Sequence, residues 1–422
     1  MTLRLTLFGI TAGAALIFLG GFAWTWRPAI PPINLEDHGD SDAKAIWRGA
    51  QLAAIGNCND CHRADTGESY AGGRPLPTPF GTIYSSNITP DAETGIGTWP
   101  EAAFKRAMRE GVDREGRQLY PAFPYDHFTK ATDEDLGALY AFLRTQLPFR
   151  KAAPANALIF PFGFRPIVAG WKLLFFREAR FQPEGSKGDA WNRGRYLVEG
   201  LAHCGGCHTP RNVFGAEKGS SSYAGGVAEG WDAPPLNSGS LAVHRWNADD
   251  LFEYLSTGWN RLHGAAAGPM ADVTNNLGGV SSTDVRAIAV YVASLSADSG
   301  DTAAPVQTNK IVATSEVRAI YEGACANCHR DPNVVGPSKA VSLSLSSAVR
   351  QWSAANTVRV VLGGIQARSG APGAYMPAFG GILTDSQIAS LADYVRARYT
   401  DQPQWADSLK EVSKARQEGS TP

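Results

Sequence analysis

The sequence has no cysteine left over for disulfides or for thiolate catalysis. All six cysteines among its 422 residues lie in three copies of one short pattern. Neither sign of charge dominates, since 39 lysines and arginines stand against 40 aspartates and glutamates, and we expect no nucleic-acid partner. No glycine fingerprint follows a predicted strand, so a dinucleotide site is not expected and any substrate oxidation must reside in another chain.

The repeated pattern is C-x-x-C-H, at residues 58–62, 204–208 and 325–329. It is the attachment signature of c-type haem, in which two thiols bond to the haem vinyl groups and the histidine binds the iron. One C-x-x-C alone could be a redox dithiol or half a zinc site, but zinc knuckles need further Cys/His pairs that the sequence lacks. We therefore predict three covalent haems, attached through Cys58, Cys61, Cys204, Cys207, Cys325 and Cys328, with proximal iron ligands His62, His208 and His329.

The N-terminal region has one long run without charge, residues 5–26. As a helix this run would extend about 33 Å, enough to cross a bilayer. Arg4 precedes it and Glu36 and Asp37 follow it, so the positive-inside rule places the N-terminus in the cytoplasm. A cleaved signal peptide, with its small-x-small site at residues 21–23, is the alternative. Both interpretations place the body on the periplasmic side of the bacterial cytoplasmic membrane.

The chain length and the spacing of the three motifs predict a mainly α fold of three tandem class I cytochrome c-like domains after an N-terminal membrane anchor. The tail is polar, and we expect it to be loosely ordered. The expected segments are an anchor or signal at 1–27, domain 1 at 40–150, an apolar connector at 151–185, domain 2 at 186–297, a linker at 298–310, domain 3 at 311–400 and the tail at 401–422.

Apolar periodicity and capping residues predict one helix before each motif and one that closes each domain. The string Tyr-Ala-Gly-Gly occurs at residues 70–73 and again at 223–226, which indicates an internal duplication. The expected helices span residues 40–56, 100–111, 132–146, 189–202, 282–295, 315–323 and 384–399.

The connector is unusually apolar between residues 157 and 176. Prolines and glycines interrupt it, among them Pro161, Gly163, Pro166 and Gly170, so a transmembrane helix is not expected. The segment either packs between domains or forms a surface that docks on a partner subunit or on the interfacial layer of a membrane.

A low-spin electron-transfer haem needs a second axial ligand, usually Met or His. Met270 follows Gly258 by 12 residues, and Met376 follows Gly364 by 12 residues, where each glycine ends a predicted helix. This equal register predicts that Met270 and Met376 are the sixth ligands of the second and third haems. A Met that merely fills a gap in the core is the alternative.

The first domain departs from this register, because Phe123 lies 12 residues after its helix-ending Gly111 and cannot bind iron. His127 is the nearest residue with suitable chemistry, and we predict it as the sixth ligand. Met108, or an iron left open, are the alternatives. Among the other histidines, His263 lies near Met270 in sequence and is a candidate neighbour of the second haem; the rest, His38, His203 and His244, carry no such signal.

The chain resembles the trihaem cytochrome c subunits of membrane-bound bacterial dehydrogenases, the type that accompanies alcohol, aldehyde, gluconate and nicotinate dehydrogenases. The resemblance covers nearly the whole chain, and many members have a methionine where this chain has Phe123. It rests on the strings FGTIYSSNITPD at residues 80–91, TGIG at 94–97, YPAFPY at 120–125, GPM at 268–270 and MPAF at 376–379.

The resemblance implies an electron-transfer subunit that accepts electrons from a catalytic dehydrogenase subunit and delivers them to ubiquinone or a terminal oxidase. Two other functions remain open: a peroxidase-like haem enzyme that uses an open first haem, and an accessory cytochrome of a haem-copper oxidase. By analogy with simpler cytochromes c, a proline carbonyl after each motif is expected to accept the proximal histidine's ring N–H. The candidates are Pro77 or Pro79, Pro234 or Pro235, and Pro337.

Overall fold

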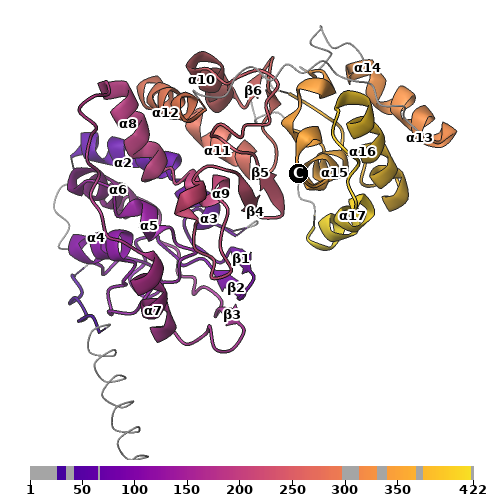
Figure 1. Cartoon of the computed structure of the whole chain (residues 1–422). Helices are drawn as coiled ribbons and strands as arrows, with labels where there is room; N and C mark the ends of the chain where they lie inside the picture. The colour runs from indigo at the N-terminus through magenta and orange to yellow at the C-terminus, as the bar shows by residue number, and fades with distance from the viewer. Residues whose placement is uncertain are drawn as a thin grey trace, which may run out of the picture. The chain divides into compact units, whose positions relative to one another are not determined.

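The computed structural model describes residues 26–34, 42–64, 67–296, 313–329, 340–366 and 374–419. The apolar run at residues 5–25, His38, the linker at 298–310 and Pro337 therefore lie outside the described residues. The chain divides into two compact units, the first made of Met1–Ala53 and Cys58–Gln182 and the second of Ala54–Asn57 and Pro183–Pro422. Both units are mainly helical (Figure 1). The division into three domains stays a prediction.

The first unit combines helices with one small antiparallel sheet of order β1-β2-β3. The sheet follows the first C-x-x-C-H motif, and its third strand comes from the apolar connector. The elements are α2 (Ala43–Ile55), α3 (Cys58–Cys61), β1 (Pro75–Thr78), β2 (Gly81–Tyr84), α4 (Glu101–Glu110), α5 (Tyr125–Phe128), α6 (Asp133–Arg144), β3 (Ala157–Leu158) and α7 (Pro166–Phe175).

The second unit contains the other two motifs, each placed between long helices. Two-stranded antiparallel hairpins, β4-β5 and β6-β7, lie between the helices of its first half. The first half has α8 (Asp189–Glu199), α9 (Gly205–His208), η1 (Gly219–Ser221), β4 (Gly226–Ala228), β5 (Trp231–Ala233), α10 (Ala248–Thr257), β6 (Trp259–Asn260), β7 (Gly264–Ala265), α11 (Pro269–Leu277) and α12 (Ser282–Leu295). The second half has α13 (Ser315–Ile320), η2 (Tyr321–Cys325), α14 (Ala326–His329), η4 (Leu343–Leu345), η5 (Ser347–Arg350), α15 (Ala355–Gly363), α16 (Asp385–Tyr399) and α17 (Ser408–Gln417).

The same helix crossing occurs in both units and explains two glycines. A Cβ atom at Gly49 of α2 would lie 2.0 Å from the carbonyl oxygen of Ala138 in α6. A Cβ atom at Gly194 of α8 would lie 1.9 Å from the carbonyl oxygen of Ala287 in α12. Only glycine permits backbones to approach this closely, so the helix before the first motif crosses α6, and the helix before the second motif crosses α12, at a fixed point.

An ion pair fastens each crossing in the same way. Arg48 Nε lies 3.1 Å from Asp135 Oδ1, and Arg193 Nε lies 2.7 Å from Asp284 Oδ1. In both pairs a second guanidinium nitrogen reaches the other carboxylate oxygen, at 3.2 Å, so the contacts are bidentate. The duplication indicated by the repeated Tyr-Ala-Gly-Gly string thus extends to the packing of the helices.

The expected helices are confirmed, with ends set by the expected caps. Thr132 accepts from the backbone N–H of Asp135 at the start of α6, and Thr384 forms a capping box with Gln387 at the start of α16. Gly111 and Gly258 end α4 and α10 in the left-handed conformation, at φ 61° and 73°. Among the described residues, no helix has both the length and the apolar character of a membrane span.

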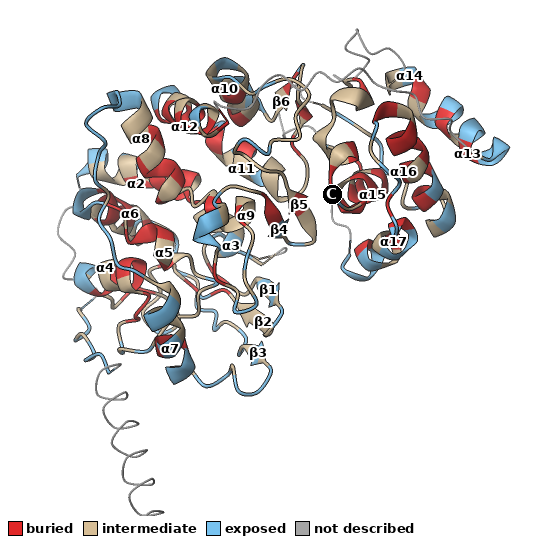
Figure 2. Cartoon of the chain, in the orientation of Figure 1, coloured by how far each residue is buried: buried red, intermediate tan, exposed pale blue. Residues whose placement is uncertain are grey.

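The expectation of a loosely ordered C-terminal tail is wrong for residues 401–419. The tail forms α17, which packs beside α15 and α16 and buries Val412 and Ala415 (Figures 1 and 2). Trp405 is buried before this helix and donates its ring N–H to the carbonyl of Gln351, at 2.9 Å. The average composition of this segment is polar, so the sequence prediction did not recognise these few apolar side chains as core residues.

We expect Trp405→Ala to lower the free energy of unfolding of the second unit by about 3–5 kcal/mol, because it removes a large buried ring together with its hydrogen bond. The Arg396 guanidinium, 4.2 Å from the ring centroid, would also lose its aromatic partner. Chemical denaturation followed by circular dichroism measures the change. Leu409→Ala, on the exposed side of α17, is the matched control and should cost well below 1 kcal/mol. Equal effects of the two substitutions would contradict the packing described for the tail.

Candidate haem sites

The first and second C-x-x-C-H motifs each follow a helix after a sharp turn of the chain, whereas the third begins at the last residue of η2 with no break in the helical backbone. Before the first and second motifs this turn places a residue other than glycine at positive φ, Asn57 at 49° and His203 at 37°. The motif then forms its own short helical turn, which is α3, α9 or α14. Within such a turn the second cysteine comes one helical turn after the first, so both thiols can face the same group.

All three proximal histidines are oriented by a backbone carbonyl. His62 Nδ1 lies 2.7 Å from the oxygen of Ser86, His208 Nδ1 lies 2.7 Å from that of Pro234, and His329 Nδ1 lies 2.9 Å from that of Val341. In the first two sites the accepting carbonyl follows the second strand of the hairpin, β2 or β5. The hairpin therefore sets the orientation of the imidazole ring.

The expectation of a proline carbonyl is confirmed only for Pro234. It is wrong for the first and third sites, where Ser86 and Val341 accept the bond in place of Pro77 or Pro79 and of Pro337. Any residue can supply a carbonyl oxygen, so the requirement is for the position of the backbone and not for proline itself.

These bonds fix the tautomer of each ring. A carbonyl oxygen can only accept, so Nδ1 carries the hydrogen in each histidine. Burial lowers the pKa of His62, His208 and His329, which keeps the rings neutral at neutral pH. A neutral imidazole protonated at Nδ1 has its lone pair on Nε2, and this is the state that binds iron.

The thiols lie in surroundings that disfavour thiolates. Burial raises the pKa of Cys58 to about 12, that of Cys204 to about 12 and that of Cys325 to about 11. Reactive dithiols and zinc sites instead need a lowered thiol pKa, which comes from nearby positive charge or a metal. Thiols whose pKa is raised in this way suit a thioether to haem better than they suit a redox dithiol.

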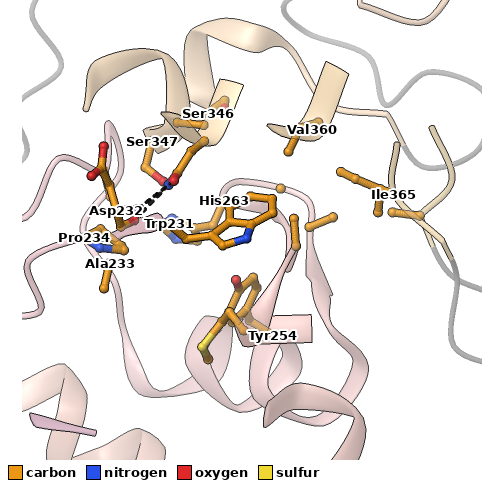
Figure 3. A pocket seen from close by; sticks show the side chains of 18 of the residues that line it. Trp231, Asp232, Ala233, Pro234, Tyr254, His263, Ser346, Ser347, Val360 and Ile365 are labelled. Carbon is orange, nitrogen blue, oxygen red and sulfur yellow. Dashed lines mark hydrogen bonds between the residues drawn. The ribbon is translucent and has the colours of Figure 1, made fainter. Parts of the chain in front are cut away.

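A single cavity in the second unit adjoins both of its motifs and has a volume of about 430 Å³. Figure 3 shows side chains from β5, α10, the turn after α15 and the segment near η5 around this cavity. Cys204, His208 and Met270 line it together with Cys325, His329 and Met376, and most of the remaining surface is aliphatic or aromatic. The structure thus brings the predicted ligand sets of the second and third haems to one shared hollow.

Two polar atoms at this cavity find no hydrogen-bond partner among the described residues. They are His263 Nε2 and Thr357 Oγ1, both fully shielded from solvent. The His263 ring stacks on Trp246 with centroids 3.4 Å apart, and burial lowers its pKa to about 4. An apolar cavity with a few unsatisfied polar atoms fits a porphyrin, which is apolar except for its propionate groups.

The expected register of the methionines agrees with the backbone geometry. In the first half of the second unit, the N–H of Ala266 returns to the carbonyl of Gly258, at 2.8 Å, shortly before Met270. In the second half, Ile365 directly follows Gly364. Met376 forms two backbone hydrogen bonds with Ile365, both of 2.9 Å. The two loops thus carry both methionines to the cavity, although iron ligation itself stays a prediction.

The first unit repeats this loop without a methionine. The N–H of Leu119 bonds to the carbonyl of Gly111 at 2.8 Å, as Ala266 does to Gly258. Phe123 then lies half-buried against Phe128, with ring centroids 5.3 Å apart. His127 is buried on α5, and Met108 is buried on α4. The register is therefore kept in the backbone, and the assignment of His127 as sixth ligand stays a prediction.

Sequence reasoning missed the residues that connect the halves of the second unit. Asn356 at the start of α15 forms a reciprocal pair with the backbone of Asp232 in β5. Its Oδ1 accepts from the Asp232 N–H, and its Nδ2 donates to the Asp232 carbonyl, both at 2.8 Å. Ser353 adds a bond to the Asp232 carboxylate, at 2.5 Å. Because Pro234 follows two residues later, this clamp holds the strand that orients His208.

We expect Asn356→Ala to disturb the second haem although Asn356 itself belongs to the third repeat. The substitution leaves two backbone groups of β5 without partners, at a cost of about 1–3 kcal/mol, and loosens the Pro234 carbonyl that orients His208. The ferric low-spin signal of the predicted second haem in electron paramagnetic resonance should broaden. The midpoint potential of that haem should rise, because a weaker carbonyl bond makes His208 less basic and a poorer ligand for ferric iron. Ser353→Ala keeps the backbone pair and is the control. An Asn356→Ala protein with both signals unchanged would contradict this role.

Comparisons with known proteins agree with this geometry. A family described as "Cytochrome c" matches residues 46–146, and one described as "Cytochrome C oxidase, cbb3-type, subunit III" matches residues 312–395. The chain is 46% identical over 97% of its length to one of the subunits of nicotinate dehydrogenase from Pseudomonas putida, and it spans only 35% of that protein.

Two further relatives are covered almost end to end. The chain is 35% identical to a fructose dehydrogenase cytochrome subunit of Gluconobacter japonicus, with 87% of the chain and 82% of that protein aligned. It is 36% identical to a gluconate 2-dehydrogenase cytochrome c subunit of Pantoea cypripedii, with 91% of the chain and 92% of that protein aligned. Together with the motifs and their oriented histidines, these similarities show that the chain belongs to the family of cytochrome c subunits of bacterial dehydrogenases.

Proposed function

We propose that this chain is a trihaem c-type cytochrome that transfers electrons and performs no bond-making chemistry of its own. The observation that carries the proposal is the common geometry of the three motifs. In each, a half-buried histidine donates Nδ1–H to a backbone carbonyl and keeps Nε2 available for iron. The shared cavity of the second unit further supports two haems placed close enough for rapid electron exchange.

The bound haems would supply the redox-active iron, and the protein would set the potential of each iron. The carbonyl bonds to His62, His208 and His329 increase the basicity of these ligands and fix their planes. The aliphatic lining around Met270 and Met376 excludes water from the second and third sites, which stabilises the ferrous state relative to the more highly charged ferric state.

We assign the electron donor from the names of the relatives, and the electron acceptor from the family resemblance of the sequence. The chain would accept electrons from a catalytic dehydrogenase subunit and deliver them to ubiquinone or a terminal oxidase. The relatives are named after nicotinate, fructose and gluconate dehydrogenases, so the family spans several substrates and the substrate of this chain's partner is left open. The apolar N-terminal run would anchor the chain in the bacterial cytoplasmic membrane, with its body in the periplasm.

For the first haem, we propose His127 as sixth ligand. It is buried within the four-residue helix α5, two residues after the buried Tyr125. Because imidazole stabilises ferric iron better than a thioether does, this haem would have the lowest potential of the three. A peroxidase-like function would require this iron to be open, and the ligand experiment below distinguishes the two.

Three covalent haems per chain are the first expected result. The pyridine haemochrome assay on purified protein should give three equivalents that survive acid-acetone extraction. Replacing one motif histidine at a time, as in His329→Ala, should leave the thioethers but remove one low-spin centre. A wild-type value of two equivalents or fewer would refute the trihaem assignment.

The sixth ligands form the second expected result. Met270→Ala and Met376→Ala should each remove part of the weak near-infrared absorption of methionine-ligated ferric haem, whereas Met108→Ala should not. His127→Ala should create one high-spin haem that binds carbon monoxide, without lowering the haem content. Stoichiometric carbon monoxide binding by the wild-type protein at one haem would contradict the role of His127 and favour the enzymatic alternative.

A further inference from the structure

The apolar connector ends in a surface that the first unit leaves uncovered. Helix α7 buries Val168 and Ala169 on its inner side, but its outer side is also apolar. We name the α7 surface as this outer side together with the loop that precedes it. It consists of Ile159, Phe160, Phe164, Ile167, Leu173 and Leu174, whose exposed fractions range from 38% at Ile167 to 95% at Phe160.

The exposure does not come from a loosely attached segment. The ammonium group of Lys172, on the inner side of α7, donates to the carbonyls of Glu110 and Gly111 at 2.5 and 2.7 Å. It also reaches Gln118 Oε1 at 2.6 Å. The carbonyl end of α4 is the negative end of its helix dipole, so this contact fastens α7 to the unit. The outer side is thus held rigidly while its leucines face outward.

The N-terminal apolar run ends beside this helix. Arg27, the residue that directly follows the run, borders the same surface hollow as Leu173 and Arg177. Its position is fixed, because a Cβ atom at Gly116 would lie 2.0 Å from the Arg27 carbonyl oxygen. The N–H of Ile30 also bonds to the carbonyl of Arg114, at 2.8 Å.

We propose that the α7 surface lies in the interfacial layer of the membrane, with its large side chains inserted among the lipid acyl chains. The proposal rests on the membrane anchor proposed above. If residues 5–26 span the bilayer, Trp26 lies at the interface, where exposed tryptophan is favoured, and α7 must lie at the same level because Arg27 borders it.

One feature favours a lipid occupant over a protein partner, and a second is compatible with it. The surface is continuous with the end of a membrane-length apolar run, so the chain itself brings it to the bilayer. A helix that is apolar on both its inner and outer sides also matches an element with protein on one side and acyl chains on the other. The connector would then provide a second attachment that fixes the orientation of the first unit toward the membrane.

The test uses the full haem-loaded chain in vesicles of phosphatidylcholine and phosphatidylglycerol. Because the six native cysteines would all be bound to haem, one added cysteine gives a single free thiol for a nitroxide label. The variants are Phe160→Cys and Leu174→Cys on the α7 surface, with Leu147→Cys as the matched control, an exposed leucine elsewhere on the same unit. Collisions of the label with oxygen, which concentrates in lipid, and with a water-soluble nickel complex are then measured. A nitrogen-equilibrated sample of the same variant gives the relaxation caused by the ferric haems alone.

Labels at residues 160 and 174 should collide with oxygen several-fold more often, and with nickel several-fold less often, than the label at residue 147. Frequent nickel collisions at residues 160 and 174 would refute the proposal. A second measurement uses the complex with the catalytic dehydrogenase chain in detergent. If the labels at residues 160 and 174 are protected from both reagents there, the proposal is refuted and that chain is the occupant. Resistance of the cytochrome to carbonate extraction from the vesicles tests the N-terminal anchor separately. The anchor proposal can therefore be supported even if the collision data refute the insertion of the α7 surface.

Discussion

The arrangement of each site depends on the hydrogen bond between a histidine Nδ1–H and a backbone carbonyl. Covalent attachment of the neighbouring cysteines would fix the backbone position of the histidine but not the orientation of its imidazole ring. The carbonyls of Ser86, Pro234 and Val341 supply that second constraint, and each belongs to a segment that must be folded before the ring is oriented. In the first two sites, the hairpin thus positions the single oxygen atom that orients the histidine.

The helix crossings perform a similar task at larger scale. Gly49 against Ala138 and Gly194 against Ala287 bring the backbones of two long helices into contact, and an arginine–aspartate pair keeps each crossing in register. Since each motif directly follows the first helix of its pair, the crossing determines where the motif lies. The two units use the same device, which explains how a duplicated sequence could diverge in its loops and keep its haem geometry.

The sequence alone predicted the motifs, the long helices and the glycine register, because these depend on local patterns of spacing and capping. It could not identify Ser86 and Val341 as the accepting carbonyls, since every residue has a carbonyl and only the path of the chain selects one. The Asn356 clamp was missed because it joins residues far apart in sequence with no characteristic residue type. The tail was misjudged because three buried side chains, Trp405, Val412 and Ala415, are diluted by polar neighbours.

The shared cavity has a consequence for how the protein matures. In the folded second unit Cys204 and Cys325 line one largely apolar cavity, and their raised pKa values make the thiols poor nucleophiles there. If the second unit carries two haems, as proposed, a chain that folded first would narrow the route by which both porphyrins enter. Thioether formation at both motifs would then come before the docking of α15 on β5. The prosthetic groups would in that case form part of the core of this unit.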